Sequence, residues 1–167
     1  MIRVFEPKLN IKDKISVLKT MQKNFISGTS PTVQEFENEL ASKFERKYCV
    51  ALSNGSVALD VALQLYDFKK DDEVIVPSFT IISCASAILR NGLTPVPVDC
   101  DIKTFNSGAG HFEAAITEKT SAIMVVHIYG LPCDMDDIIA LAKKHNLKII
   151  EDAAEVIGQE YKGRRCG

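Results

Sequence analysis

The first part of the chain has apolar residues at helical spacing, in two stretches separated by the segment SGTSP. The first stretch covers residues 11–26 and the second runs from Ser30 to about Phe44. Ser30 followed by Pro31 is a typical helix start, because Ser favours the N-cap and Pro favours the first helical position. We expect residues 1–46 to form an N-terminal helical arm.

From residue 47 the pattern changes, and short runs that are apolar at nearly every position alternate with helical stretches. The expected strands are YCVAL (48–52), EVIVP (73–77), PVPVD (95–99), SAIMVVHIY (121–129) and LKIIED (147–152). The expected helices lie at residues 56–68, 80–92, 111–116 and 134–146. Apolar strands separated by helices are typical of a parallel sheet covered on both faces. The sequence therefore predicts an α/β domain over residues 47–167.

The end of the chain predicts a hairpin that turns at Lys162 and Gly163, with a return arm that the chain does not complete. A hairpin with one full arm is an unusual end for a domain. We expect the 167 residues to be the front portion of a longer protein.

Composition and charge narrow the class of function. The net charge is −2, with 20 basic and 22 acidic residues, so nothing indicates a nucleic-acid partner. No apolar run approaches the ~20 residues that span a bilayer, and the N-terminus lacks an apolar signal core. The five cysteines are widely spaced and form no C-x-x-C pair, so we expect neither a metal site nor disulfides. We expect a cytoplasmic protein with no membrane partner.

Candidate binding residues lie where strands end, because ligands of open α/β sheets bind beyond the carboxyl ends of the strands. In SNGS, Gly55 lets a ligand approach the backbone, and Ser56 begins a helix whose free N–H groups favour an anion such as phosphate. An ordinary N-capped turn is the simpler alternative. His127 also ends a strand, where it either contacts a ligand or partner or is a hydrogen-bonded core histidine.

The segment EDAAE (151–155) follows an apolar strand and reaches the same edge of the sheet. Asp152 could pair with a protonated ring nitrogen, and together with a phosphate site this is the pattern of pyridoxal 5′-phosphate (PLP). A capping role or a magnesium ligand are alternatives for Asp152.

Taken in order, these segments resemble the DegT/DnrJ/EryC1/StrS family of PLP-dependent nucleotide-sugar aminotransferases. The resemblance covers nearly the whole chain and rests on ISGTSPTVQEFE, SNGSVALDVAL, DDEVIVPSFT, PVPVDCD, ITEKTSAIMVVHIYG, DMDDI and LKIIEDAAEVIGQEYKGR. It implies the large domain of PLP-dependent transferase fold type I, incomplete at its C-terminus. The PSFTIISC, VHIYG and EDAAE segments look most like members that act on GDP-linked 4-keto-6-deoxy sugars.

The resemblance implies roles for individual residues. Gly55 and Ser56 would hold the PLP phosphate, Asp152 would pair with the pyridine nitrogen, and Glu155 would lie by the phenolic oxygen, where other members carry Gln or His. Ile81 stands where many relatives have an aromatic residue stacked on the ring. It can pack on the ring but lacks the stacking energy, ~0.5–1.5 kcal/mol. The Schiff-base lysine would lie shortly after Gly167, so we expect no catalytic residue and no activity in this stretch alone.

The implied reaction is transfer of an amino group from glutamate to a nucleotide-linked 4-keto-6-deoxy sugar, by a complete protein that is a homodimer. Three alternatives stay open: a PLP- or PMP-dependent sugar C-3 dehydratase of the same family, a non-catalytic fragment that binds nucleotide sugar or PLP, and an α/β domain for another phosphate. The nucleotide base and the aminated carbon are not decided by these residues.

Overall fold

A computed structural model describes residues 6–167, which form two compact units dividing after Ala51. Each unit is described by itself. The predicted boundary between an arm over residues 1–46 and a main domain from residue 47 stays a prediction. Among residues 6–167, no helix combines the length and apolar character needed to cross a membrane.

The first unit contains helices α1 (Ile11–Gln22) and α2 (Pro31–Lys43). Asn10 caps α1 in a capping box with Asp13, and Pro31 occupies the start of α2 after the N-cap Ser30, as predicted. The first helix is shorter than expected. It ends at Gln22 because Asn24, two residues later, adopts a left-handed conformation (φ 57°), which Asn tolerates well at helix ends.

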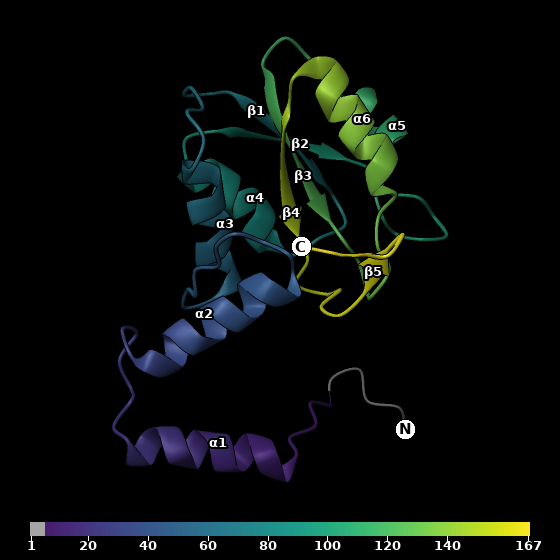
Figure 1. Cartoon of the computed structure of the whole chain (residues 1–167). Coiled ribbons are helices and arrows are strands. Elements are labelled where there is room, and N and C mark those ends of the chain that lie inside the picture. Colours follow the sequence, from purple (N-terminus) through teal and green to yellow (C-terminus); the bar gives the residue numbers. More distant parts are fainter. Residues whose placement is uncertain (1–5) are drawn as a thin grey trace. The chain divides into compact units, whose positions relative to one another are not determined.

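The second unit is built on a four-stranded parallel sheet (Figure 1). Its strands are β1 (Glu73–Pro77), β2 (Thr94–Val98), β3 (Thr120–Val126) and β4 (Lys148–Asp152), in the order β2-β1-β3-β4. A two-stranded antiparallel hairpin, β5 (Glu160–Tyr161) and β6 (Arg164–Arg165), follows and turns at Lys162 and Gly163, as the sequence predicts. The α/β fold with a parallel sheet is confirmed.

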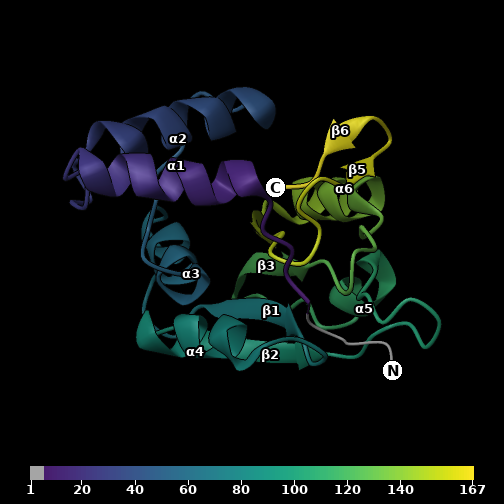
Figure 2. The ribbon, with the colours of Figure 1, turned by 90° about the horizontal axis from the view of Figure 1, so that it is seen from below.

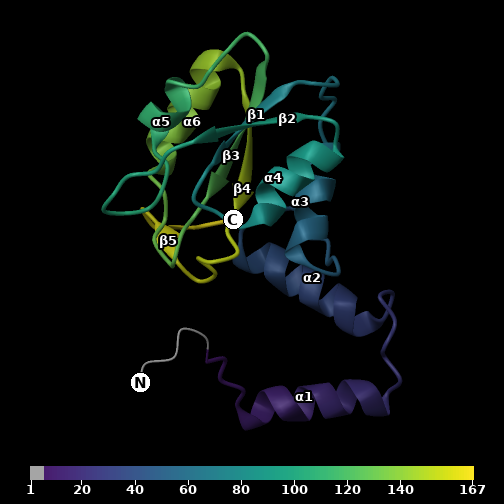
Figure 3. The same cartoon turned by 180° about the vertical axis from the view of Figure 1, so that it is seen from behind.

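Helices cover both faces of the sheet (Figures 2 and 3). Helices α3 (Gly55–Gln64) and α4 (Ile82–Arg90) pack on one face, and α5 (Ala109–Glu113) and α6 (Met135–His145) pack on the other. Strand residues alternate between the faces, so that Val74 and Val76 face α3 and α4 while Ile75 lies in the core beneath α6. Each such fully buried side chain stabilises the fold by about 1.5–3 kcal/mol.

One predicted strand is absent. The segment YCVAL (48–52) forms no ladder with any strand among residues 6–167, and its residues Tyr48 and Val50 are largely exposed. Tyr, Cys and Val favour extended backbone, but a strand also needs a neighbouring strand to satisfy its N–H and C=O groups. Residue type alone could not reveal that no strand among residues 6–167 pairs with this segment.

Candidate active site

The carboxyl ends of the strands meet the N-termini of two helices at one end of the sheet. Helix α4 begins shortly after β1 ends. Helix α3 begins beside it, as shown by the hydroxyls of Ser56 and Ser83, which lie 2.8 Å apart in the first turns of the two helices. Figure 1 shows both helices starting at the end of the sheet where β3 and β4 finish. This is the position at which ligands bind in open α/β sheets.

The first turn of α3 can accept an anion. Asn54 caps the helix by accepting a hydrogen bond from the Val57 amide at 3.0 Å, but within residues 6–167 the amides of Gly55 and Ser56 donate none. A methyl group built on Gly55 would meet no atom within 4 Å, so the backbone there faces open space. Two free amides at the positive end of a helix are what a phosphate group requires.

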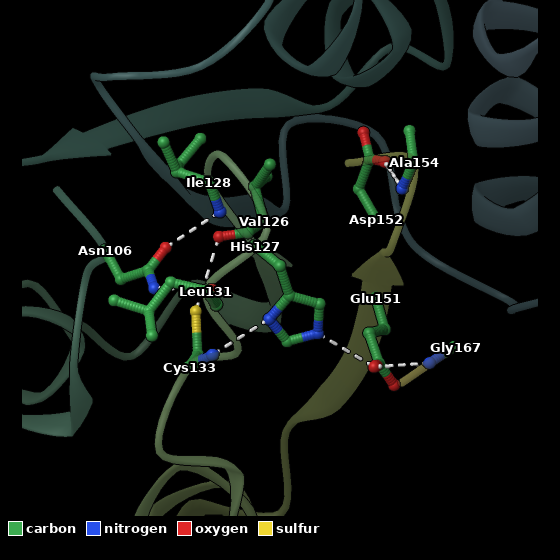
Figure 4. Close-up of polar contacts among 10 residues, drawn as sticks. All are labelled: Asn106, Val126, His127, Ile128, Leu131, Cys133, Glu151, Asp152, Ala154 and Gly167. Atoms are coloured by element: carbon green, nitrogen blue, oxygen red, sulfur yellow. Dashed lines mark hydrogen bonds and ion pairs between the residues drawn. The ribbon is translucent and has the colours of Figure 1, made fainter. Parts of the chain in front are cut away.

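Asp152 ends β4 on the same face of the sheet as α3 and α4. Its neighbour two residues earlier, Ile150, packs in the apolar cluster beneath these helices, and strand alternation sends Asp152 to the same face. One carboxylate oxygen of Asp152 accepts a hydrogen bond from the Ala154 amide at 3.1 Å (Figure 4). The other lies 3.5 Å from the thiol of Cys84, in the first turn of α4. Asp152 thus lies half-buried beside the start of α4.

Glu151 points to the opposite face, where it is bound to a buried histidine (Figure 4). His127 is fully buried, with Nε2 2.9 Å from a Glu151 oxygen and Nδ1 accepting the Cys133 amide at 3.0 Å. Because Nδ1 accepts, the ring proton is on Nε2 and is donated to Glu151. The same Glu151 oxygen accepts the Gly167 amide at 2.7 Å. Of the two alternatives for His127, the hydrogen-bonded core histidine is the one found.

Glu155 and Ile81 flank this end of the sheet. Glu155 is exposed and accepts a hydrogen bond from the Tyr129 amide at 2.7 Å. The ring of Tyr129 meets Phe79 edge-on at 6.1 Å between centroids, and Phe79 belongs to the segment that leads to Ile81. Ile81 is the N-cap of α4 and is 63% exposed, so its side chain is free to cover a bound group.

The five candidate residues therefore fall into one connected region. Gly55 and Ser56 begin α3, and the Ser56 hydroxyl contacts α4. Ile81 is the N-cap of α4, and Asp152 contacts the first turn of α4. Glu155 is linked to the segment before α4 through Tyr129 and Phe79. The sequence did not single out Cys84, whose link to Asp152 joins residues 68 positions apart. Free amides for a phosphate and a carboxylate for a ring nitrogen are both present, so the residues fit PLP.

Comparison with known proteins gives the relationship directly. Residues 8–167 match the DegT/DnrJ/EryC1/StrS aminotransferase family. A GDP-perosamine synthase from Escherichia coli O157:H7 is 43% identical over 166 residues, which cover 99% of this chain and 46% of the relative. This chain thus spans about half the length of that relative.

Two solved structures have the same fold. An aminotransferase from Psychrobacter cryohalolentis superimposes with a TM-score of 0.90 at 42% identity, over 95% of this chain and 40% of that one. A GDP-4-keto-6-deoxymannose-3-dehydratase with a trapped PLP–glutamate geminal diamine gives a TM-score of 0.85 at 26% identity, over 92% and 42% of the two chains. The match over residues 8–167 places this chain in the DegT/DnrJ/EryC1/StrS aminotransferase family.

Proposed function

We propose that the chain is the cofactor-binding part of an aminotransferase that moves an amino group from glutamate to a nucleotide-linked 4-keto-6-deoxy sugar, with PLP as cofactor. The observation that carries the proposal is that the free amides of α3 and the Asp152 carboxylate lie at the same end and on the same face of the sheet. The likeness to a GDP-perosamine synthase supports a GDP-linked sugar as substrate.

In this proposal the chain holds the cofactor at both ends. The amides of Gly55 and Ser56, at the positive end of α3, would bind the phosphate group. Asp152 would accept a hydrogen bond from the N–H of the ring and so favour the protonated form of the ring nitrogen. Glu155, one oxygen of which is held by the Tyr129 amide, would lie by the phenolic group and orient the ring. Ile81, whose side chain is exposed, would pack on one face of the ring.

PLP supplies an electron sink when its ring nitrogen is protonated. The chain's contribution is therefore the carboxylate that maintains this protonation, together with the contacts that fix the ring.

The complete protein would supply further groups. The family resemblance implies a Schiff-base lysine after Gly167 and a homodimer, and both are part of the proposal. The exposed apolar side chains of α1, which include Ile11, Leu18 and Met21, are consistent with a helix that packs on another surface in the assembled enzyme.

The proposal is tested on the complete protein, by incubating it with PLP, glutamate and GDP-4-keto-6-deoxymannose. Mass spectrometry should show a product in which the keto oxygen is replaced by an amino group, and PLP should titrate into the apoprotein. Asp152→Asn should weaken PLP binding by roughly 10- to 150-fold, the value of a hydrogen bond to a charged group. A protein that binds no PLP would refute the proposal.

The C-3 dehydratase is the second candidate, because a dehydratase with PLP and glutamate is among the similar structures. The same experiment separates the two reactions. Loss of the C-3 hydroxyl as water, with no nitrogen retained in the sugar, would assign the dehydratase reaction and exclude the aminotransferase.

A further inference from the structure

Cys84 links the start of α4 to the carboxylate of Asp152. The side chain is fully buried in the apolar cluster beneath α3 and α4, but its sulfur lies at the polar end of that cluster. The Sγ atom is 3.5 Å from Oδ2 of Asp152 and 3.3 Å from the hydroxyl of Thr80. The Ala154 amide binds the other carboxylate oxygen, so both oxygens of Asp152 have a donor from the protein.

The direction of each hydrogen bond follows from the proton count. A carboxylate only accepts, so the single thiol proton of Cys84 is donated to Asp152. The sulfur is then left as an acceptor, and Thr80 donates its hydroxyl proton to it. Burial, and secondarily the nearby Asp152 charge, raises the pKa of Cys84 to about 11, so the thiol proton is present at neutral pH.

We propose that Cys84 is a positioning residue, which, backed by Thr80, fixes the orientation of the Asp152 carboxylate toward the ring nitrogen of PLP. This inference rests on the proposed function. Two donors, the Ala154 amide on one oxygen and the Cys84 thiol on the other, hold the carboxylate before the cofactor arrives. A preorganised carboxylate loses less freedom on binding than one that rotates. Because S–H is a weak donor, it leaves the Asp152 oxygen available for the stronger N–H donor of the ring.

The competing explanation is that Cys84 is only a small apolar side chain that fills space, as buried cysteines commonly do. The two explanations predict different effects for substitutions at Cys84. A space-filling role is preserved by Cys84→Val, which removes the donor but keeps an apolar side chain. A positioning role is preserved by Cys84→Ser, which keeps a donor in a smaller side chain.

The experiment measures PLP binding to the apo form of the complete protein for wild type, Cys84→Val, Cys84→Ser and Cys84→Ala. We expect Cys84→Val and Cys84→Ala to raise the Kd for PLP by roughly 2- to 10-fold, and Cys84→Ser to stay within about 2-fold of wild type. Inorganic phosphate, used as a competitor for the phosphate site alone, should bind all four proteins equally. Cys133→Val is the matched control, because Cys133 is a buried thiol on the opposite face of the sheet and should leave the Kd unchanged.

A double-mutant cycle tests whether Cys84 affects PLP binding through the Asp152 carboxylate. In an Asp152→Asn background, Cys84→Val should no longer change the Kd, since Cys84 acts through the carboxylate. An equal effect of Cys84→Val with and without Asp152 would overturn the inference, as would a Kd unchanged by both Cys84→Val and Cys84→Ala. If wild type binds no PLP, the proposed function itself fails. If wild type binds PLP and Asp152→Asn weakens it while Cys84→Val does not, only the positioning role fails.

Discussion

Replacing His127 by leucine tests the buried polar link between β3 and β4. The substitution removes two hydrogen bonds at once, because Nδ1 accepts the Cys133 amide and Nε2 donates to Glu151. The Cys133 amide is left buried without an acceptor, at a cost of about 1–3 kcal/mol. The Glu151 carboxylate, a charged acceptor, loses the hydrogen bond donated by Nε2, worth about 1.5–3 kcal/mol, but it keeps the Gly167 amide and is 21% exposed.

Burial of the more apolar leucine side chain offsets part of this loss, by about 1–2 kcal/mol. The expected decrease in the free energy of unfolding is therefore about 2–4 kcal/mol. Urea denaturation followed by circular dichroism measures it on the chain of 167 residues. A decrease below about 1 kcal/mol would contradict the hydrogen-bond assignment.

Two further variants separate the two bonds of His127. In His127→Asn the amide oxygen can take the place of Nδ1 and still accept the Cys133 amide. In His127→Gln the amide nitrogen can take the place of Nε2 and still donate to Glu151. Each should recover about half of the loss seen with leucine. If neither recovers any stability, the cost arises from packing and the reasoning fails.

The remaining predictions concern capping, the phosphate site and alkaline pH. Asn54→Ala should cost about 0.5–2 kcal/mol in urea denaturation because it removes the cap of α3, whereas Ser30→Ala, whose side chain caps nothing on α2, should cost less than about 0.5 kcal/mol. Gly55→Ala should leave stability equal or higher, since its methyl group meets no atom, but should weaken PLP binding at least tenfold because the methyl group occupies the phosphate approach; unchanged binding would contradict the phosphate site. Burial raises the pKa of Cys84 to about 11 and of Cys133 to about 12. Above about pH 9 the thiols ionise in the unfolded chain but stay protonated in the folded one. The free energy of unfolding should therefore fall above about pH 9, by up to about 1.4 kcal/mol per pH unit for each thiol. The double alanine variant should show a flatter pH profile over this range, and an equally steep one would refute this.

The sequence predicts much of the fold because its strands are strongly patterned. EVIVP is apolar on both faces and forms β1 as expected, since either side of a central parallel strand is buried. YCVAL has similar composition and forms no strand, because strand formation also depends on an available neighbour. The local sequence shows whether side chains favour a strand, but it does not show whether a neighbouring strand is available to pair with it.

Prediction of the candidate site is limited in the same way. Asp152 and Ser56 could be singled out because each follows or begins an element at the predicted ligand-binding edge. The partner of Asp152 could not, because Cys84 approaches it only through the packing of α4 on the sheet. The histidine partner of Glu151 depends on the β3–β4 register, in which Val126 faces Asp152, and no local pattern states that register.

The adjacent carboxylates of β4 have a consequence for how the gene can change. Glu151 and Asp152 face opposite sides of the sheet, one toward a buried imidazole and the other toward the proposed cofactor site. Successive side chains of a strand alternate between the two faces of the sheet, so the face that each carboxylate reaches depends on its position along β4. Deleting one residue within this strand would exchange the environments of the two side chains without altering the chemical identity of either. We therefore expect substitutions in β4 to be tolerated more readily than the insertion or deletion of a single codon.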